Sequence, residues 1–351
     1  MKLKLIPILL FLSCITHVYA QQKMIVISPK QTQQAEKLYN SGLEKYNSKS
    51  YSAAIADLQK SIEINQNLKA SYLLLAKAQQ ANKQSEEAVK TLLSYAAKTE
   101  RVDSMFFLIA KVYFDEADYP QSINFLNRAV SAYTPADDKT IYLRGLSYYY
   151  NAQYAEAIAD LDKVIAQNEV AVLYNDRATM KKANHDYQGA MADYEQAISL
   201  DTNNVEYINN RGVLKYEMED YDAAIEDFDY VIRLDNQNFN AYNNRGIANA
   251  QSLRYEEALA DFNKALALHP DVYQVYSNKG YVLYKQKKYE EAIQCFNLAL
   301  QHNPQYGEAY LHRGNTKELM RNPQGACEDW QKAADLGVEK AKEYINNQCQ
   351  K

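Results

Sequence analysis

The sequence predicts an all-α solenoid of about nine stacked helical hairpins with a capping helix at the C-terminus. The first observation is a phrase that opens with Tyr and approximates Tyr-x-x-Ala-Ile/Leu. From Tyr119 onward it recurs at spacings of 35, 33, 34, 34 and 34 residues, a period typical of stacked hairpins. The second is composition, because 10 Gly and 7 Pro in 351 residues leave few helix breakers. A lone hairpin cannot bury its apolar face, so neighbouring hairpins must supply the core.

The first twenty residues, 1–20, have the pattern of a secretory signal peptide. Lys2 and Lys4 form a basic start, and the apolar run Leu5–Ile15 is shorter than the roughly 20 residues that cross a bilayer. A small-x-small cleavage site ends at Ala20. We therefore expect export to the periplasm or the outer envelope, and no later stretch predicts a transmembrane segment. The alternative is a lipoprotein signal acylated at Cys14, although the residues before it depart from the usual lipobox.

Residues 21–34 show no helical period and include Pro29, which predicts an extended lead-in. The hairpins follow as copies one to three, residues 35–136, and copies four to nine, residues 137–336. One extra residue in the period, at the junction 133–137, predicts either a kink between these groups or a slightly longer turn. The nine copies begin near Ala35, Lys69, Asp103, Asp138, Ala171, Val205, Phe239, Tyr273 and Gly307.

Two slots of every copy hold small residues, which lets paired helices approach closely. Position 8 holds Gly42, Ala76, Ala110, Gly145, Ala178, Gly212, Gly246, Gly280 and Gly314. Position 20 holds Ala54, Ala88, Ser122, Ala157, Ala190, Ala224, Ala258, Ala292 and Ala326. This pattern resembles the tetratricopeptide repeat family from residue 35 to about 336. The resemblance implies a right-handed superhelix with a concave groove that binds protein or peptide partners.

A basic residue at position 7 of the last six copies stands where the family usually has an apolar one. Position 23 is Asp in five of those copies. Where the Asp is replaced by Cys295, the Arg is replaced by Lys279, and in the third copy both slots are apolar. Because the slots change together, we expect a partly shielded ion pair inside the hairpin, with acidic-ligand binding as the alternative. The expected pairs are Arg144 with Asp160, Arg177 with Asp193, Arg211 with Asp227, Arg245 with Asp261, and Arg313 with Asp329.

Residues 337–351 are expected to form a C-terminal capping helix. Gly337 ends the last repeat helix, and the segment after it would cover the exposed apolar face of the ninth copy. Cys327 lies 10 residues before Gly337 and Cys349 lies 12 after it. On antiparallel helices these thiols would meet, and in an oxidising compartment we expect them to form a structural disulfide. The alternative is two free thiols. The stretch 326–330 resembles the close of secreted tetratricopeptide proteins of Bacteroidetes-type bacteria.

No sequence pattern for catalysis or metal binding is found. The chain lacks a Gly-rich phosphate loop, a Gly-x-Ser-x-Gly elbow and His-Glu-x-x-His. A formal charge of −5, without a basic stripe, argues against a nucleic-acid partner. The sequence therefore predicts no enzyme, no cofactor and no metal. Lys never occupies position 5, so the carboxylate clamp of chaperone-binding members of the family is not expected.

The family resemblance places the groove on the first helix of each hairpin, chiefly at positions 2, 5, 9, 12 and 13. Aromatic side chains at these slots would anchor a partner, although those at position 12 could instead pack on the next hairpin. Amides at positions 5 and 6 of consecutive copies could pair with a peptide backbone, or lie on solvated surface. The expected groove residues are Tyr142, Tyr149, Asn175, Asn209, Asn210, Tyr216, Asn243, Asn244, Asn278, Tyr281 and Tyr284.

These features together predict a protein–protein interaction scaffold of the cell envelope, which holds a partner segment in its concave groove. One alternative is a structural component that self-assembles through its convex face or its terminal repeats. Another is a non-catalytic accessory subunit of an enzyme or secretion complex. Substitutions in the groove, set against substitutions on the convex face, would separate the first reading from the second.

Overall fold

The computed structural model describes residues 27–99, 102–132 and 136–349. Throughout these ranges the regular structure is helical, with no strand. Contacts divide the chain into two units, one ending at Ser147 and the other beginning at Tyr148. The expected signal peptide, including Cys14, lies outside the described residues, as does most of the junction 133–137.

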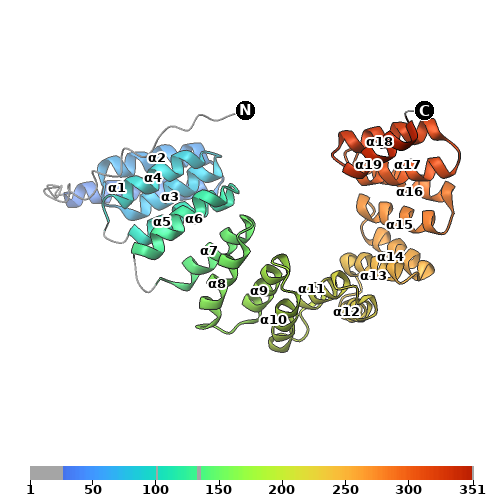
Figure 1. Ribbon diagram of the computed structural model, residues 1–351. Helices are drawn as coiled ribbons and strands as arrows, with labels where there is room; N and C mark the ends of the chain where they lie inside the picture. The colour runs from blue at the N-terminus through green and yellow to red at the C-terminus, as the bar shows by residue number, and fades with distance from the viewer. Residues whose placement is uncertain (1–26, 100–101, 133–135, 350–351) are drawn as a thin grey trace. The chain divides into compact units, whose positions relative to one another are not determined.

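The first unit contains three helical hairpins and the start of a fourth. From the first helix to the sixth, successive helices run antiparallel and pack on their neighbours in chain order (Figure 1). Its helices are α1 (Pro29–Asn47), α2 (Tyr51–Ile64), α3 (Lys69–Ala81), α4 (Ser85–Ala96), α5 (Val102–Asp115), α6 (Tyr119–Ala132) and most of α7 (Asp138–Tyr150).

The second unit continues the same pattern to the C-terminus (Figure 1). Its helices are α8 (Tyr154–Ile165), α9 (Ala171–Ala183), α10 (Tyr187–Leu200), α11 (Val205–Glu217), α12 (Tyr221–Leu234), α13 (Phe239–Gln251), α14 (Tyr255–Leu268), α15 (Tyr273–Lys285), α16 (Tyr289–His302), α17 (Gly307–Leu319), α18 (Pro323–Asp335) and α19 (Glu339–Tyr344), followed by the short π-helix η2 (Ile345–Cys349).

The phase of the hairpins is the one that the repeat predicts. In the second unit, α9, α11, α13, α15 and α17 begin at the expected copy starts, and their partner helices begin at Tyr187, Tyr221, Tyr255, Tyr289 and Pro323. Helices α1 to α6 thus form three hairpins and α9 to α18 form five in the described part of the chain, and the expectation of an all-α solenoid is confirmed.

The extended lead-in expected over residues 21–34 is wrong for its second half, because α1 begins at Pro29. Ser28 caps this helix: its hydroxyl accepts from the backbone N–H of Gln31, and the Gln31 side chain accepts from the backbone N–H of Ser28. This reciprocal capping box satisfies two N–H groups that the helix leaves unpaired. Pro29 occupies the first helical turn, where its missing N–H costs nothing. A proline taken as a helix breaker is therefore a helix start.

Close packing of the two helices within a hairpin depends on the small residue at position 8. A Cβ atom added to Gly212 would lie 2.8 Å from the ring of Phe228, and one added to Gly246 would lie 2.7 Å from the ring of Phe262. Real Cβ atoms do not approach other atoms so closely, so the aromatic ring on the second helix occupies the space that the glycine leaves. The close approach inferred from the sequence is present in both hairpins.

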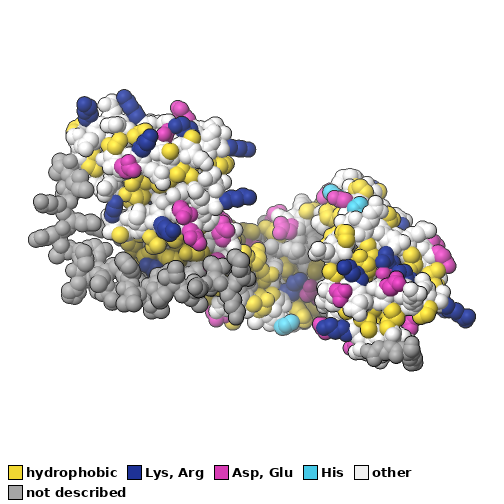
Figure 2. Space-filling model, turned by 90° about the horizontal axis from the view of Figure 1, so that it is seen from above, with side chains coloured by type: hydrophobic (Ala, Val, Ile, Leu, Met, Phe, Trp, Pro, Cys, Tyr) yellow, Lys and Arg dark blue, Asp and Glu magenta, His cyan; other side chains and the backbone are white. Residues whose placement is uncertain are grey.

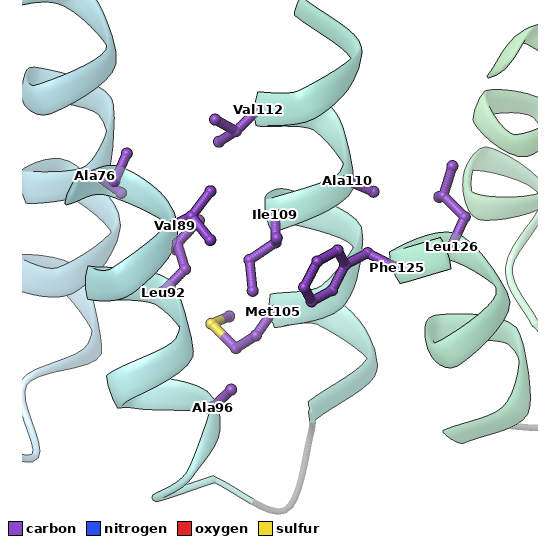
Figure 3. Packing of buried hydrophobic residues seen from close by; sticks show 11 residues of the cluster. Ala76, Val89, Leu92, Ala96, Met105, Ile109, Ala110, Val112, Phe125 and Leu126 are labelled. Atoms are coloured by element: carbon purple, nitrogen blue, oxygen red, sulfur yellow. The ribbon is translucent and has the colours of Figure 1, made fainter. Parts of the chain in front are cut away.

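An apolar cluster fills the third hairpin and its contact with the second (Figure 3). Met105 and Ile109 project from α5 toward Leu92 of α4, and Phe125 of α6 closes the cluster from the other side. These side chains are buried, with Ile109 at 0% exposure. Burial of such apolar surface supplies most of the stability of a stacked hairpin.

The last hairpin is covered by α19 and η2, as expected for a capping segment. Gly337, with φ of +89°, makes the turn after α18 in a conformation that glycine adopts without strain. Cys327 and Cys349 form a disulfide with their Cα atoms 5.8 Å apart. Tyr344 of α19 stacks on buried Trp330, with ring centroids 5.1 Å apart. The apolar end of the array is thereby covered, as the end of a solenoid requires.

Candidate functional site

Four of the expected ion pairs are bidentate contacts between the two helices of one hairpin. In the sixth hairpin, the Nε and Nη2 atoms of Arg211 donate to the two carboxylate oxygens of Asp227, at 2.9 and 2.7 Å. Asp227 is 5% exposed, so the contact is largely shielded from water. The same geometry joins Arg177 to Asp193, Arg245 to Asp261, and Arg313 to Asp329.

The fifth expected pair and the eighth hairpin differ from these four. Arg144 and Asp160 belong to different units, so their pairing stays a prediction. In the eighth hairpin, Lys279 donates instead to Asn263 at 2.8 Å. Cys295, at position 23, is a free, buried thiol, and burial raises its pKa.

A second cation, not predicted from the sequence, contacts the same carboxylates in three of these hairpins. Lys215 lies one turn after Arg211 on α11, and its ammonium contacts Asp227 at 2.9 Å. Lys181 contacts Asp193 and Lys317 contacts Asp329, each at 2.8 Å. The signal was present in the sequence, because position 11 is Lys in these three copies. Each carboxylate therefore has two counter-charges within its own hairpin, which supports a structural role for the set.

Some of these arginines also connect neighbouring hairpins. Nη1 of Arg177 contacts Asp162, on the second helix of the preceding hairpin, at 2.7 Å. Hydrogen bonds with Asp193, and then with Asp162, raise the pKa of Arg177 against the opposing effect of burial. Arg245 bridges Asp261 and Asp229 in the same way. These guanidinium groups thus hold the stack together, and all three of their nitrogens already donate to carboxylates.

The asparagines at positions 5 and 6 form a ladder between hairpins. In each rung, the position 6 amide of one copy donates to the position 5 amide of the copy before it. Asn175 is only 4% exposed, and the other members are half-buried. Part of the hydrogen-bonding capacity expected for a ligand is therefore used in stacking. The rungs run from Asn210 to Asn175 (3.0 Å), from Asn244 to Asn209 (3.1 Å) and from Asn278 to Asn243 (3.1 Å).

The expected groove tyrosines lie at several separate places. Tyr142 is half-buried in the first unit, whereas Tyr149 contacts Tyr154 in the second. The other three share the face of the later hairpins. The Tyr216 hydroxyl accepts from Gln251 at 3.4 Å, and Tyr281 and Tyr284 stack with ring centroids 6.3 Å apart. The structure therefore brings part of the expected aromatic set together.

A hollow of about 420 Å³ lies on the first helices of hairpins six to nine. Three of the expected groove residues line it: Tyr216, Asn278 and Tyr281. Its floor is apolar, with Ile247 and Val282 among the lining side chains. Four further polar members were not predicted individually, because the residue type at their positions varies between copies. They are Gln251, Lys285, Glu308 and His312.

His312 is the most perturbed of these polar groups. Its ring lies 5.1 Å from the ring of Tyr281 and 6.0 Å from that of Phe296, measured between centroids. Burial lowers the pKa of His312 to about 4, and the charges of Lys340 and Lys285 lower it further in the same direction. The imidazole is therefore neutral at pH 7. It offers the hollow an uncharged donor or acceptor beside an aromatic wall.

Charge on the surface is otherwise mixed. On the face drawn in Figure 2, Lys and Arg side chains are interspersed with Asp and Glu side chains. Among the described residues, no group of three or more His, Cys, Asp or Glu side chains could hold a metal ion. No helix in that part of the chain is long and apolar enough to cross a membrane. The hollow is a concave, partly apolar site of the kind in which ligands bind.

The repeat segments match known sequence families. Models of the tetratricopeptide repeat match residues 139–168, 209–272 and 273–306. No curated protein matches the chain.

Solved structures show the same fold at low sequence identity. A tetratricopeptide repeat protein from Parabacteroides merdae is 18% identical, with a TM-score of 0.60 over 70% of this chain and 97% of that one. PilF of Pseudomonas aeruginosa is 21% identical, with a TM-score of 0.51 over 61% of this chain and 97% of that one. The C-terminal part of a repeat protein from Cytophaga hutchinsonii is 18% identical, with a TM-score of 0.51 over 68% and 98%. With its periodic hairpins and small residues at fixed slots, this chain contains tetratricopeptide repeats over residues 139–168 and 209–306.

Proposed function

We propose that this protein is an interaction scaffold that binds an extended segment of a partner protein along the first helices of its second unit. The observation that carries the proposal is the hollow on hairpins six to nine. Its apolar floor and aromatic side chains, above all Tyr281, can anchor a side chain. Amide groups such as those of Gln251 and Asn278 lie beside it and can pair with a peptide backbone.

The asparagine ladder supports this proposal indirectly. Because each rung ties one hairpin to the next, the first helices keep a fixed spacing along the stack. A surface that is ordered before binding costs less conformational entropy when the partner docks. The ladder therefore serves recognition by holding its neighbours in place, in addition to any direct contact.

Site-specific crosslinking tests the proposal. A photoreactive residue is placed at Tyr281 or Gln251 in the hollow, or at Tyr230, which is 38% exposed on the second helix α12. We expect partner adducts from the first two positions and none from Tyr230. Adducts from Tyr230 alone would contradict the groove and favour a convex binding face.

Affinity measurements give a second arm. We expect Tyr281→Ala to weaken binding of a captured partner segment by about tenfold, since a central aromatic anchor is a typical hot spot. Tyr230→Ala is the matched control, because it removes the same side chain from the other helix of a hairpin. Thermal unfolding of both variants verifies that they are folded. Equal losses in the two variants would count against the hollow.

We also propose that the mature chain works in the periplasm or the outer envelope. The disulfide between Cys327 and Cys349 supports an oxidising compartment, and the sequence of residues 1–20 supports export. N-terminal sequencing of the protein from its native cell, with a free-thiol count, tests both points. An uncleaved N-terminus, or three free thiols in the chain after Ala20, would contradict the location.

A further inference from the structure

The asparagine ladder stops at the hollow. Its last rung runs from Asn278, at position 6 of the eighth hairpin, to Asn243, at position 5 of the seventh. The next rung would join His312, at position 6 of the ninth hairpin, to Ser277, at position 5 of the eighth. Helices α15 and α17, which carry these two residues, pack together as the earlier pairs of first helices do. The ladder is therefore interrupted by a change of side chains and not by a change in stacking.

His312 and Ser277 do not form this rung. The Ser277 hydroxyl hydrogen-bonds instead to the side chain of Tyr306. The imidazole of His312 makes no hydrogen bond to another side chain in the part of the chain that the structure describes, since the contact of its Nε2 with Glu308 is 4.0 Å long. The His312 side chain is 28% exposed, and both it and Ser277 line the hollow. They leave an open rung between them that a ligand can reach.

Further polar atoms of the lining are also unused. Asn278 donates to Asn243 through its amide nitrogen, and its carbonyl oxygen accepts no hydrogen bond from the described residues. The carbonyl oxygen of Gln251 is likewise unused there, because this side chain acts only as a donor, to Tyr216. The neutral imidazole of His312 adds one N–H donor and one bare nitrogen acceptor. A ligand that satisfies this set must therefore offer both donors and an acceptor.

The charges of the lining favour an uncharged ligand. Lys285 and Glu308 are its two ionised side chains, and their charges cancel. Burial lowers the pKa of His312 to about 4, so the imidazole adds no charge at pH 7. A carboxylate would lack donors for the unused carbonyl oxygens, and an ammonium would lack an acceptor for the imidazole N–H. A carboxamide offers both, and it is the group that forms the complete rungs of the ladder.

We propose that the open rung between Ser277 and His312 binds the side-chain amide of an Asn or Gln residue in an uncharged, extended segment of the partner. The amide oxygen of the ligand accepts from the N–H of His312, and its NH2 group donates to the carbonyl oxygen of Asn278. The bound amide then stands where position 5 of the eighth hairpin lacks an asparagine. The proposal rests on the function proposed above and specifies the side chain that the hollow selects.

The probe is a library of random linear peptides with both termini blocked, selected on the full mature chain. Blocked termini leave side chains as the only groups that distinguish one peptide from another. We expect enrichment of Asn or Gln, and no enrichment of Asp, Glu, Lys or Arg. In a selected peptide, replacing the amide residue with an apolar residue of similar size, or with the corresponding acid, should weaken binding by about fivefold, because partly shielded hydrogen bonds are lost.

The variant His312→Phe tests the imidazole. It keeps an aromatic ring against Tyr281 and Phe296 but removes both ring nitrogens. We expect this variant to bind the amide peptide and its apolar version equally, with binding of the apolar version unchanged. His302→Phe is the matched control, because the ring of His302 also stacks on a tyrosine, Tyr276, but lies outside the lining of the hollow. The control should keep the preference for the amide.

The variant Ser277→Asn tests the open rung itself. It supplies the amide that position 5 holds in the hairpin before, where Asn243 completes a rung. We expect the new side chain to pair with His312 and to take the place of the ligand amide. The preference for the amide peptide should then be lost without a loss of thermal stability. Thermal unfolding of all three variants verifies that they are folded.

The outcomes separate this inference from the proposed function. Selected peptides that need Tyr281 for binding but show no preference for an amide would overturn the inference and leave the groove function intact. A preference that survives His312→Phe or Ser277→Asn would overturn it in the same way, because the amide would then bind elsewhere. Selection of no peptide at all would overturn the groove function and the inference together.

Discussion

The third and sixth hairpins solve the same packing problem with opposite chemistry. In the third, positions 7 and 23 hold Ile109 and Phe125, both buried in an apolar cluster. In the sixth, the same positions hold Arg211 and Asp227, joined by two short hydrogen bonds. The apolar pair gains from desolvation, whereas the charged pair must offset a desolvation cost with its own contacts. The residues at positions 7 and 23 therefore have to change together, from an apolar pair to a charged pair.

The first hairpin extends this comparison with an intermediate set. Its position 23 is Asp57, which accepts hydrogen bonds from Lys45 at position 11 and Ser41 at position 7. The hydrogen bond from Lys45, and then the one from Ser41, lower the pKa of Asp57. Position 11 is therefore the third member of the set. One cation suffices for this carboxylate when a hydroxyl supplies the second donor.

Loss of the carboxylate in the sixth hairpin should have the largest effect. We expect Asp227→Ala to lower the free energy of unfolding by about 3 kcal/mol, because it leaves Arg211 and Lys215 without their shared counter-charge. Arg211 keeps 23% side-chain exposure and can recover some hydration, which places the effect at the low end for a buried pair. Urea unfolding followed by circular dichroism measures it.

The matched comparison is Arg211→Ala, which leaves Asp227 paired with Lys215. We expect a smaller loss for Arg211→Ala, and a loss for the double variant well below the sum of the two. Because repeat arrays unfold in segments, hydrogen exchange in α11 and α12 should show that the loss is local. Additive effects of the two substitutions would show that the pair is not coupled.

The eighth hairpin offers a test in the reverse direction. We expect Cys295→Asp to lower stability by about 2 kcal/mol, because it places a carboxylate at a buried site where position 11 is Leu283. Adding Leu283→Lys should recover part of this loss by restoring the second cation of the set. Thermal unfolding of the two variants measures the difference. No recovery in the double variant would contradict a three-residue set.

The asparagine ladder should contribute less than the ion pairs. We expect Asn244→Ala to lower the free energy of unfolding by about 1 kcal/mol, the usual value for a lost hydrogen bond that leaves a partly buried acceptor on Asn209. Asn240→Ala, at an exposed position of the same helix, is the control and should change stability little. An equal effect of the two substitutions would show that this hydrogen bond does not stabilise the stacking of the hairpins.

The array could be predicted from the sequence because its determinants are local and repeated. The period fixed the phase of the hairpins, and the joint change at positions 7 and 23 revealed a contact across two helices. The start of α1 could not be read in the same way. It depends on a capping box at Ser28 that lies before the first copy and has no counterpart in the others to compare.

The candidate site was less accessible to sequence reasoning. Tyr281 and Asn278 were found because their slots belong to a pattern, whereas Lys285, Glu308 and His312 occupy positions whose residue type varies between copies. The ladder was also not predicted. Adjacent asparagines within a copy suggested a binding site for a ligand, whereas each one pairs with an asparagine of a neighbouring hairpin. Periodicity predicts what the copies share, and a binding site depends on what they do not share.

Transplanting the apolar set should have the smallest effect and tests the comparison most directly. The variant Arg211→Ile, Lys215→Tyr and Asp227→Phe gives the sixth hairpin the three side chains that the third has at those positions, where Tyr113 stacks on Phe125. Replacing a buried charged set with apolar groups of similar volume is often neutral or stabilising. We expect stability within about 1 kcal/mol of the unsubstituted protein, although Asp227→Ala alone costs about 3 kcal/mol.

A triple variant as unstable as Asp227→Ala would contradict this. The charges of the sixth hairpin would then stabilise it through an interaction other than packing within the hairpin. The charge of Glu195, on the preceding hairpin, which helps to raise the pKa of Arg211, would then be the first interaction to examine.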